Sequence, residues 1–281
     1  MRHILLPTDF SENSWGAISY AIELFNKDKV KFHILHAFSP YVVTPSGPIE
    51  AQVMDETIFR AAEQNCRREL ERLKERILNN YPNLDIELYA KFDFFVTSIE
   101  RFLEEHNINC IVLGTKGASG LKEIVMGSNT SSLIGKVKAP ILAIPEDTTY
   151  KSIKKVVIGS DLSVVPTKKG VETIRRLLEL TSAELHIVSI HKLERELSIQ
   201  EKDIQDVYVE LLKGHTVLFN TRYEKDIESG INEYVKEIDA EMVCVIAKKH
   251  TFLSRLLERS KSKSLTNHTK IPLLVLNERF F

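Results

Sequence analysis

Residues 110 to 130 read Cys-Ile-Val-Leu-Gly-Thr-Lys-Gly-Ala-Ser-Gly-Leu-Lys-Glu-Ile-Val-Met-Gly-Ser-Asn-Thr. The apolar run 110–113 predicts a buried strand, and the segment from Ser128 onward predicts a helix. Glycines in the loop between them let backbone N–H groups approach a ligand closely. Because a helix N-terminus adds unpaired N–H groups and a partial positive charge, this stretch favours the binding of phosphate.

The spacing of the glycines is more specific than their number. The loop is neither a Walker A sequence nor the dinucleotide-binding pattern Gly-x-Gly-x-x-Gly. It has Gly114 and Gly117 separated by two residues, then nine residues, then Gly127 and Ser128. This spacing resembles the nucleotide-binding signature of the universal stress protein family. A structural strand-to-helix connection with Ser128 as N-cap is the alternative, and it does not account for three glycines.

Length and composition limit the classes of function. The 281 residues carry 38 Lys and Arg against 39 Asp and Glu, so no overall basic field favours nucleic acid or an anionic membrane. Three widely spaced cysteines fit neither a zinc site nor a dithiol pair, and indicate a reducing compartment. The apolar run at the start is too short for a signal peptide. We therefore expect a soluble, cytoplasmic protein of roughly two domains.

The chain repeats itself. Residues 2–9 read Arg-His-Ile-Leu-Leu-Pro-Thr-Asp and residues 154–161 read Lys-Lys-Val-Val-Ile-Gly-Ser-Asp, each followed by a serine and a helical pattern. Residues 138–146 likewise resemble residues 270–278. We expect two copies of one unit, copy one at 1–147 and copy two at 152–281. Their short polar junction should hold them close together.

Strands and helices are expected to alternate in both copies, which predicts a parallel α/β sheet. In copy one we expect strands near 3–7, 31–37, 84–90, 109–113 and 141–144, and helices near 12–26, 50–81, 96–106 and 128–137. In copy two we expect strands near 154–158, 185–189, 216–219, 242–246 and 273–276. The proline-containing segment 38–49 is expected to be an irregular loop that serves as a lid or a contact surface.

The resemblance implies a more detailed architecture. It implies two tandem Rossmann-like domains of the adenine nucleotide alpha hydrolase-like type, each a five-stranded parallel sheet with helices on both faces. Strand one would neighbour strand four, so Asp9 and the Gly114 loop would face each other at the carboxyl edge. Asp9 would accept a hydrogen bond from a ribose hydroxyl or an adenine amine, or lie behind a divalent cation. Capping of the first helix is the alternative use of this carboxylate.

The resemblance also implies the remaining site residues. Around adenine and ribose it places Pro7, Thr8, Asp9, Ala37 and Leu113. Around the phosphates it places Gly114 and Gly117, with donors from Gly127, Ser128, Asn129 and Thr130. Lys116 is a further phosphate candidate, although a lysine in such a loop is more often solvated. The cofactor would be ATP, or AMP or ADP, with Mg²⁺. We expect neither catalytic residues nor protein metal ligands, and His33 and His36 lie three residues apart, on opposite faces of a strand.

Copy two departs from the signature. Residues 247–250 read Ala-Lys-Lys-His where copy one has Gly114 to Gly117, and Arg259 stands where Gly127 does. We therefore expect one nucleotide site per chain, in copy one. The basic run from 248 to 263 is interpreted as a solvated face rather than an anion site.

The function implied is that of an adenine-nucleotide-binding module in a stress response or its regulation, with slow or absent chemistry. A slow ATP-hydrolysing enzyme and an interaction scaffold without nucleotide are the alternatives. The resemblance further implies that the terminal strands of the two copies pair about a pseudo-twofold axis. A homodimer of the whole chain and the identity of a protein partner are left open.

Overall fold

A computed structural model describes residues 1–26, 28–38, 43–44, 47–48, 56–115, 128–134, 136–225, 227–247 and 271–277. Copy one contains β1 (Arg2–Pro7), α1 (Glu12–Phe25), β2 (Val30–Phe38), β3 (Val43–Thr44), β4 (Gly47–Pro48), α2 (Glu56–Asn80), β5 (Asp85–Phe92), α3 (Phe95–Glu105), β6 (Cys110–Gly114), α4 (Ser128–Leu133) and β7 (Ile141–Ile144). Copy two contains β8 (Lys155–Gly159), α5 (Lys168–Thr181), β9 (Glu184–His191), α6 (Ile199–Leu211), β10 (Val217–Tyr223), α7 (Ile227–Glu237), β11 (Met242–Ala247) and β12 (Leu273–Asn277).

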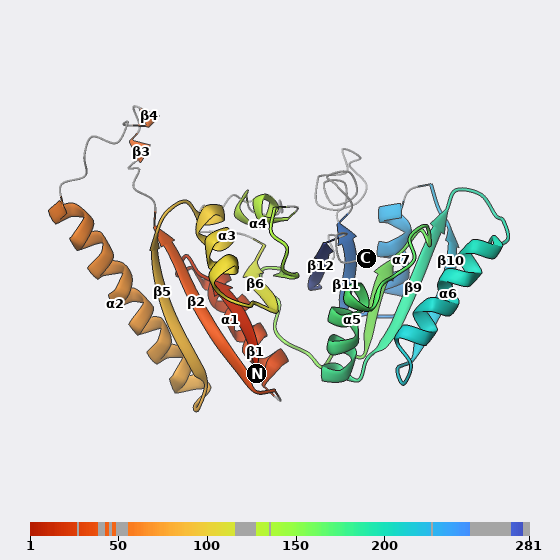
Figure 1. The fold of residues 1–281 in the computed structure, drawn as a ribbon, viewed down its shortest axis with the longest axis horizontal. Helices are drawn as coiled ribbons and strands as arrows, with labels where there is room; N and C mark the ends of the chain where they lie inside the picture. The colour runs from red at the N-terminus through yellow and green to blue at the C-terminus, as the bar shows by residue number, and fades with distance from the viewer. Residues whose placement is uncertain are drawn as a thin grey trace.

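Ten of these strands form one sheet, in the order β10-β9-β8-β11-β12-β7-β6-β1-β2-β5 (Figure 1). In this sheet, every pairing between two strands of the same copy is parallel. Both copies follow the same order, in which the first strand lies between the second and the fourth. The predicted parallel sheets and the neighbouring positions of strands one and four are confirmed.

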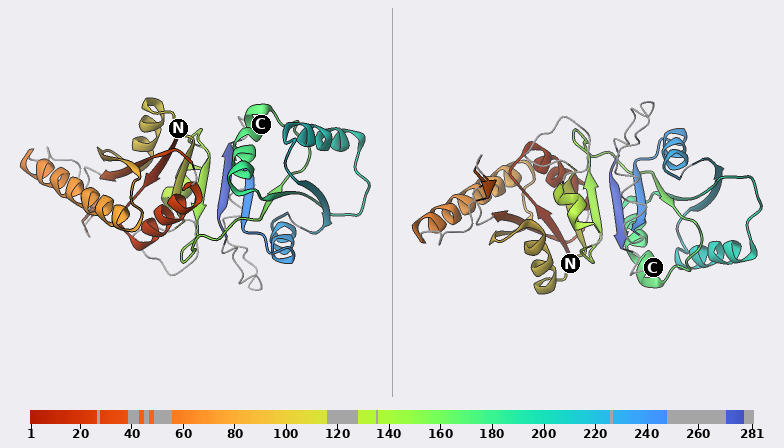
Figure 2. Two further views of the ribbon diagram at one scale, coloured as in Figure 1. Left: turned by 90° about the horizontal axis from the view of Figure 1, so that it is seen from below. Right: turned by 90° about the horizontal axis from the view of Figure 1, so that it is seen from above.

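The two copies meet at one antiparallel pairing, between β7 and β12. Leu142 lies opposite Leu274, and Ile141 lies opposite Val275. Figure 2 shows these two strands side by side at the centre of the molecule. The expected pairing of terminal strands is therefore present, and it joins two five-stranded sheets into one.

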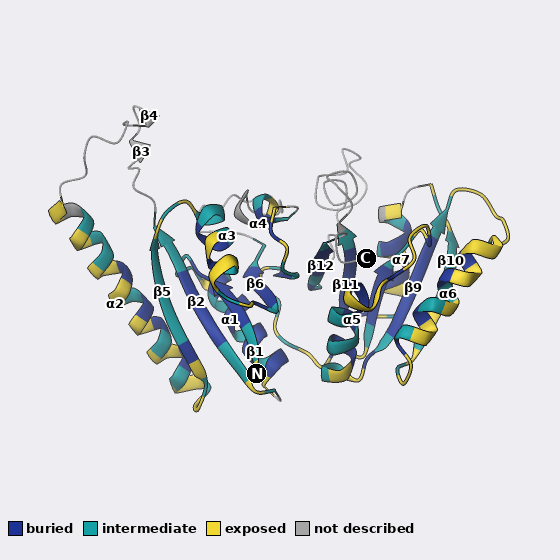
Figure 3. Ribbon diagram, viewed as in Figure 1, coloured by how far each residue is buried: buried dark blue, intermediate teal, exposed yellow. Residues whose placement is uncertain are grey.

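Helices cover both faces of the sheet. One buried apolar cluster contains side chains of α1, α2, α5 and α6, and a second cluster contains side chains of α3, α4 and α7 on the opposite face. The central strands of the sheet are mostly buried, the edge strands β5 and β10 are mostly of intermediate exposure, and the outer sides of α2 and α6 are exposed (Figure 3). The first cluster is continuous through both copies, because Leu142 and Leu274 belong to it together with Tyr20 and Leu177.

Side-chain caps begin the corresponding first helices of the two copies. The Ser14 N–H donates to the Ser11 hydroxyl at 3.2 Å at the start of α1. The Gly170 N–H donates to the Thr167 hydroxyl at 3.1 Å at the start of α5. Each bond satisfies a backbone donor that the helix leaves unpaired. Both helices are 14 residues long, so positions counted from the two caps correspond.

The expectation of an irregular loop at 38–49 was wrong in part. Val43–Thr44 and Gly47–Pro48 form a short antiparallel pair, β3 with β4. β-branched Val43 and Thr44 favour extended backbone, and a proline is tolerated at the edge of such a pair. Residues 39–42, 45–46 and 49–55 lie outside the described residues, so the expected start of the next helix at 50 also lies outside them.

No helix in the described ranges is long and apolar enough to cross a membrane.

The continuous core predicts that a lesion in copy two also weakens copy one. Leu274 in β12 is 4% exposed, and Leu274→Ala should lower the free energy of unfolding by about 2–5 kcal/mol because it leaves a cavity in this core. Trp15, the single tryptophan of the chain, lies in α1 of copy one. During urea unfolding of Leu274→Ala, Trp15 fluorescence and far-ultraviolet circular dichroism should both give this fall in the free energy of unfolding.

The control is Leu218→Ala, on an edge strand of copy two, where the side chain is 41% exposed. This variant should change stability by no more than about 0.5 kcal/mol. A Trp15 transition that stays at the wild-type urea concentration in Leu274→Ala would show that the two copies unfold independently.

Candidate functional site

The carboxyl ends of β1, β2 and β6 lie beside one another, because β1 is the strand between the other two. From β1 the sheet continues through β2 to β5 on one side and through β6 to β7 on the other. Such a reversal of strand order is where ligands bind in open α/β sheets. The structure therefore brings together Pro7 at the end of β1, Thr8 and Asp9 directly after it, Ala37 in β2, and Leu113 and Gly114 in β6.

The turn after β1 is held by its own side chains. The Thr8 N–H donates to the Leu35 carbonyl at 2.9 Å, which extends the pairing with β2, and the Phe10 N–H donates to the Thr8 hydroxyl at 3.0 Å. Asp9 Oδ1 accepts from the backbone N–H of Ser11 at 3.1 Å and from its hydroxyl at 2.5 Å. These bonds stabilise the left-handed backbone of Phe10, whose φ is 62°, unusual for a bulky residue.

Copy two builds the same turn without the glycine signature. Leu162 has φ 49° and donates its N–H to the Ser160 hydroxyl at 3.1 Å. Asp161 Oδ1 accepts from the N–H and hydroxyl of Ser163 at 3.1 and 2.6 Å. The turn therefore needs the carboxylate whether or not a phosphate loop is present. The N-cap of α1 is Ser11 rather than Asp9, so the alternative in which Asp9 caps the first helix is wrong.

Gly114 has a packing role that the glycine spacing did not reveal. A Cβ atom at this position would lie 2.2 Å from Asn13 Nδ2 and 3.1 Å from the Asn13 backbone oxygen. A Cβ here would force the Asn13 side chain to turn away and would also press on the Asn13 backbone oxygen, so the first turn of α1 favours a glycine at the end of β6. Close approach of helix to strand thus accounts for Gly114 independently of any phosphate.

Thr130 connects α4 to β6. Its hydroxyl is buried and donates to the Gly114 carbonyl at 2.9 Å. The hydroxyl that was expected to donate to a phosphate is therefore used inside the protein. Ser128 and Asn129 begin α4, and Lys116, Gly117 and Gly127 lie outside the described residues.

Two further aromatic residues line this edge and were not among the predicted site residues. The His36 ring nitrogen Nδ1 donates to the Thr8 carbonyl oxygen at 2.8 Å. The Phe10 and His36 rings lie 4.4 Å apart between centroids. His36 could have been predicted from the sequence, because it directly precedes Ala37 near the end of a strand. No sequence feature indicated the left-handed conformation of Phe10.

His33 lies on the other face of β2, among rings rather than ligands. Its Nε2 lies 2.8 Å from His3 Nδ1, and its Nδ1 lies 3.1 Å from the Tyr89 hydroxyl. Burial is the main cause that lowers the pKa of His33 to about 4; nearby His3, His106 and Lys31 contribute to the lowering, and Glu87 opposes it. No cluster of His, Cys, Asp and Glu suited to a metal ion occurs within the described ranges.

The model of the universal stress protein family matches this chain twice, at residues 1–145 and 152–277. The chain belongs to the universal stress protein family. It is a tandem member of that family, with two family units in one polypeptide.

Relatives agree with this assignment. A universal stress protein of Mycolicibacterium smegmatis is 24% identical over 196 residues, a match that covers 67% of this chain and 63% of the relative, slightly under two thirds of its length. Universal stress protein MJ0577 of Methanocaldococcus jannaschii is 24% identical over 152 residues, which cover 51% of this chain and 94% of the relative. The crystal structure of a universal stress protein from Archaeoglobus fulgidus shares the fold at TM-score 0.71 and 19% identity, with 98% of each chain covered.

The contact between Gly114 and Asn13 generates a prediction about stability. Gly114→Ala should destabilise the protein by about 1–3 kcal/mol, because the new methyl group overlaps Asn13. Gly16→Ala is the matched control, since a Cβ at Gly16 meets nothing within 4 Å. Because alanine favours a helix more than glycine does, this substitution should raise the free energy of unfolding by about 1 kcal/mol. Equilibrium urea unfolding measures both changes, and an equal effect of the two substitutions would contradict the packing role.

The environment of His33 predicts a dependence of stability on pH. The folded pKa of about 4 is below the ordinary value of 6.5, so the unfolded chain binds the proton more readily. Stability from this group is complete above pH 6.5 and is lost as the pH falls toward 4, by as much as roughly 3 kcal/mol. His33→Phe should remove this contribution to the slope of stability against pH.

Unfolding free energies of both proteins, measured from pH 8 to pH 4, test this expectation. Above pH 7 the two curves should run parallel, and below it the wild-type curve should fall more steeply. Identical slopes throughout the acid range would show that His33 is not a source of the pH dependence.

Proposed function

We propose that copy one binds an adenine nucleotide, ATP or its AMP or ADP relatives, and that the chain acts as a nucleotide-responsive regulatory module. The observation that carries the proposal is the place of the described residues on either side of the glycine-containing segment. β6 ends at Gly114 beside the carboxyl end of β1, where the strand order reverses, and α4 begins at Ser128.

Different residues at the carboxyl edge of the sheet would contact different parts of the nucleotide. The backbone at Pro7 and Thr8, with Ala37 and Leu113, would border the base and ribose. Asp9 Oδ1 accepts two hydrogen bonds from Ser11 in the turn, and the Asp9 carboxylate would also accept a hydrogen bond from the ribose or the adenine amine.

The phosphates would lie over the loop. Gly117 and Gly127 would give their backbone N–H groups access to the phosphate oxygens, and the start of α4 would add the donors of Ser128 and Asn129. Mg²⁺ would be held by the phosphates rather than by a protein cluster, because Asp9 is the single carboxylate among the proposed ligands.

A route from this loop to copy two runs through β7. The Thr115 N–H donates to the Ile144 carbonyl at 2.9 Å, and the Asn277 side-chain amide donates to the Val137 carbonyl at 3.2 Å. A ligand bound beside Thr115 would therefore adjoin β7, and the segment between α4 and β7 touches β12. We propose that nucleotide binding in copy one changes copy two through this contact between Val137 and Asn277.

The experiment is to denature the purified full-length protein and identify released nucleotide by chromatography and mass. About one adenine nucleotide per chain is expected. In Gly117→Asp with Gly127→Asp the occupancy should fall at least about tenfold, because two carboxylates would face the phosphates.

The matched control places the same two carboxylates in copy two, at the aligned positions, as His250→Asp with Arg259→Asp. It should retain the wild-type occupancy. A protein that releases no nucleotide and does not bind added ATP with Mg²⁺ would contradict the proposal and favour an interaction scaffold. Equal losses in both double variants would place the site elsewhere.

A further inference from the structure

A second cavity lies far from the nucleotide edge, where the two copies meet. It has a volume of about 1050 Å³, near the upper end of the range for ligand pockets. Arg2 and Ile4 of β1 and Cys110 of β6 border it, so it opens at the amino ends of these strands. Gly114 and Thr8 lie at the carboxyl ends of the same strands.

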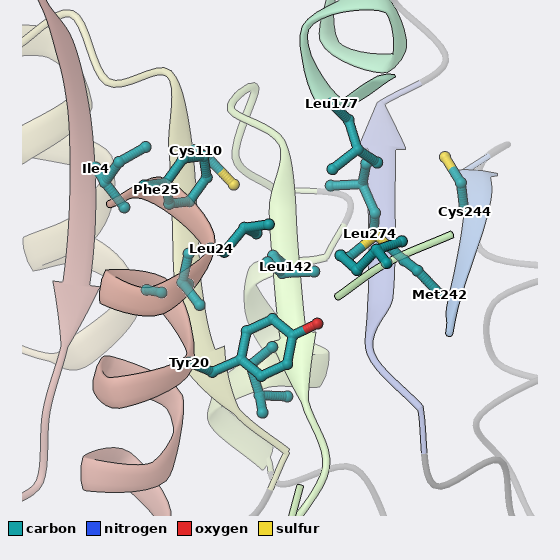
Figure 4. Packing of buried hydrophobic residues seen from close by; sticks show 14 of the residues in the cluster. Ile4, Tyr20, Leu24, Phe25, Cys110, Leu142, Leu177, Met242, Cys244 and Leu274 are labelled. Atoms are coloured by element: carbon teal, nitrogen blue, oxygen red, sulfur yellow. The ribbon is translucent and has the colours of Figure 1, made fainter. Parts of the chain in front are cut away.

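Both copies contribute apolar walls to this cavity. Six of its buried wall residues are Ile4, Phe25 and Cys110 from copy one and Leu177, Met242 and Leu274 from copy two. Figure 4 shows these side chains approaching one another from either side of β7 and β12. One unit supplies only part of these walls, so this cavity forms only where two units meet.

The rim of the cavity is predominantly cationic. The lining includes the six cations Arg2, Arg101, Lys136, Lys138, Lys169 and Arg176, against the three carboxylates of Glu100, Glu104 and Glu172. Three of these cations are already paired: Arg2 with Asp28 at 2.7 Å, Arg101 with Asp93 at 2.6 Å, and Arg176 with Glu172 at 2.5 Å. Lys136 and Lys138 are exposed, and neither forms an ion pair with another residue in the described part of the chain.

A smaller cavity on α1 provides an internal comparison. Counted from the helix caps, Gly16 and Tyr20 of α1 correspond to Glu172 and Arg176 of α5, and each residue lines the cavity of its own helix. The α1 cavity is covered by residues 145–150, with the Tyr150 ring 5.3 Å from the Tyr20 ring. Its lining contains four acidic residues, Glu12, Glu23, Glu146 and Asp147, and no Lys or Arg.

We propose that the cavity between the copies binds a fatty carboxylate, an unbranched acyl chain with one anionic head group. The acyl chain would lie against the buried walls, where apolar surface is removed from water. The carboxylate would lie at the rim beside Lys136 and Lys138, whose ammonium groups have no ion-pair partner among the described residues and attract an anion. The opposite charge of the corresponding α1 cavity indicates that the cationic rim is specific to this position.

Calorimetric titration of the full-length, delipidated protein with dodecanoate, below its micelle concentration, tests the proposal. Saturable binding of one dodecanoate per chain is expected, and dodecyltrimethylammonium, with the same chain and a cationic head, should not bind. Lys136→Glu with Lys138→Glu should weaken dodecanoate binding about tenfold by reversing two rim charges. Thr173→Phe, which places a ring in the cavity from α5, should abolish it.

The charge control is Lys202→Glu with Lys213→Glu, two exposed lysines of copy two that do not line the cavity. It should change the affinity less than twofold. The proposal is overturned by the absence of saturable binding, by equal binding of the cationic amphiphile, or by unchanged binding in Thr173→Phe. Nucleotide release, measured on the same variants, should remain at the wild-type level because the two sites lie at opposite edges.

Discussion

The antiparallel pairing of β7 with β12 is the contact on which the rest of the structure depends. A few backbone pairs, among them Leu142 with Leu274, convert two parallel sheets into one sheet of ten strands. The same contact makes the apolar cluster under α1 and α5 continuous and forms the cavity between the copies. It also places the end of β12 beside the segment that leads from α4 to β7, through Asn277 and Val137.

Much of the fold was predictable from the sequence, because apolar runs mark buried strands whatever their neighbours are. Strand ends were less predictable, since pairing continues after the side chains become polar. The strands expected at 185–189 and 216–219 extend to His191 and Tyr223, which still pair with each other. Strand order is a different matter, because alternating strands and helices fit several orders, and it followed from the family resemblance rather than from periodicity.

The candidate site was likewise predictable only in part. Asp9 and Gly114 were expected to face each other, and their strands are neighbours. The partners that hold them were missed, because contacts such as Asn13 with Gly114 join residues far apart in the sequence. The left-handed Phe10 was missed since no glycine marks it. The repetition of the Asp-Ser turn in copy two separates the part of the motif that builds the fold from the part available to a ligand.

The two cavities of opposite charge beside α1 and α5 have a consequence for symmetry. In a dimer of identical chains, every substitution occurs at both related positions, so the two cavities would always carry the same charge. A single polypeptide that contains both units is free of that restriction, and Tyr20 and Arg176 can differ at related positions. Fusion of the two units therefore lets the two halves differ at related positions: copy one has the glycine spacing after β6, and copy two contributes Arg176 to a cavity where the related residue of copy one is Tyr20.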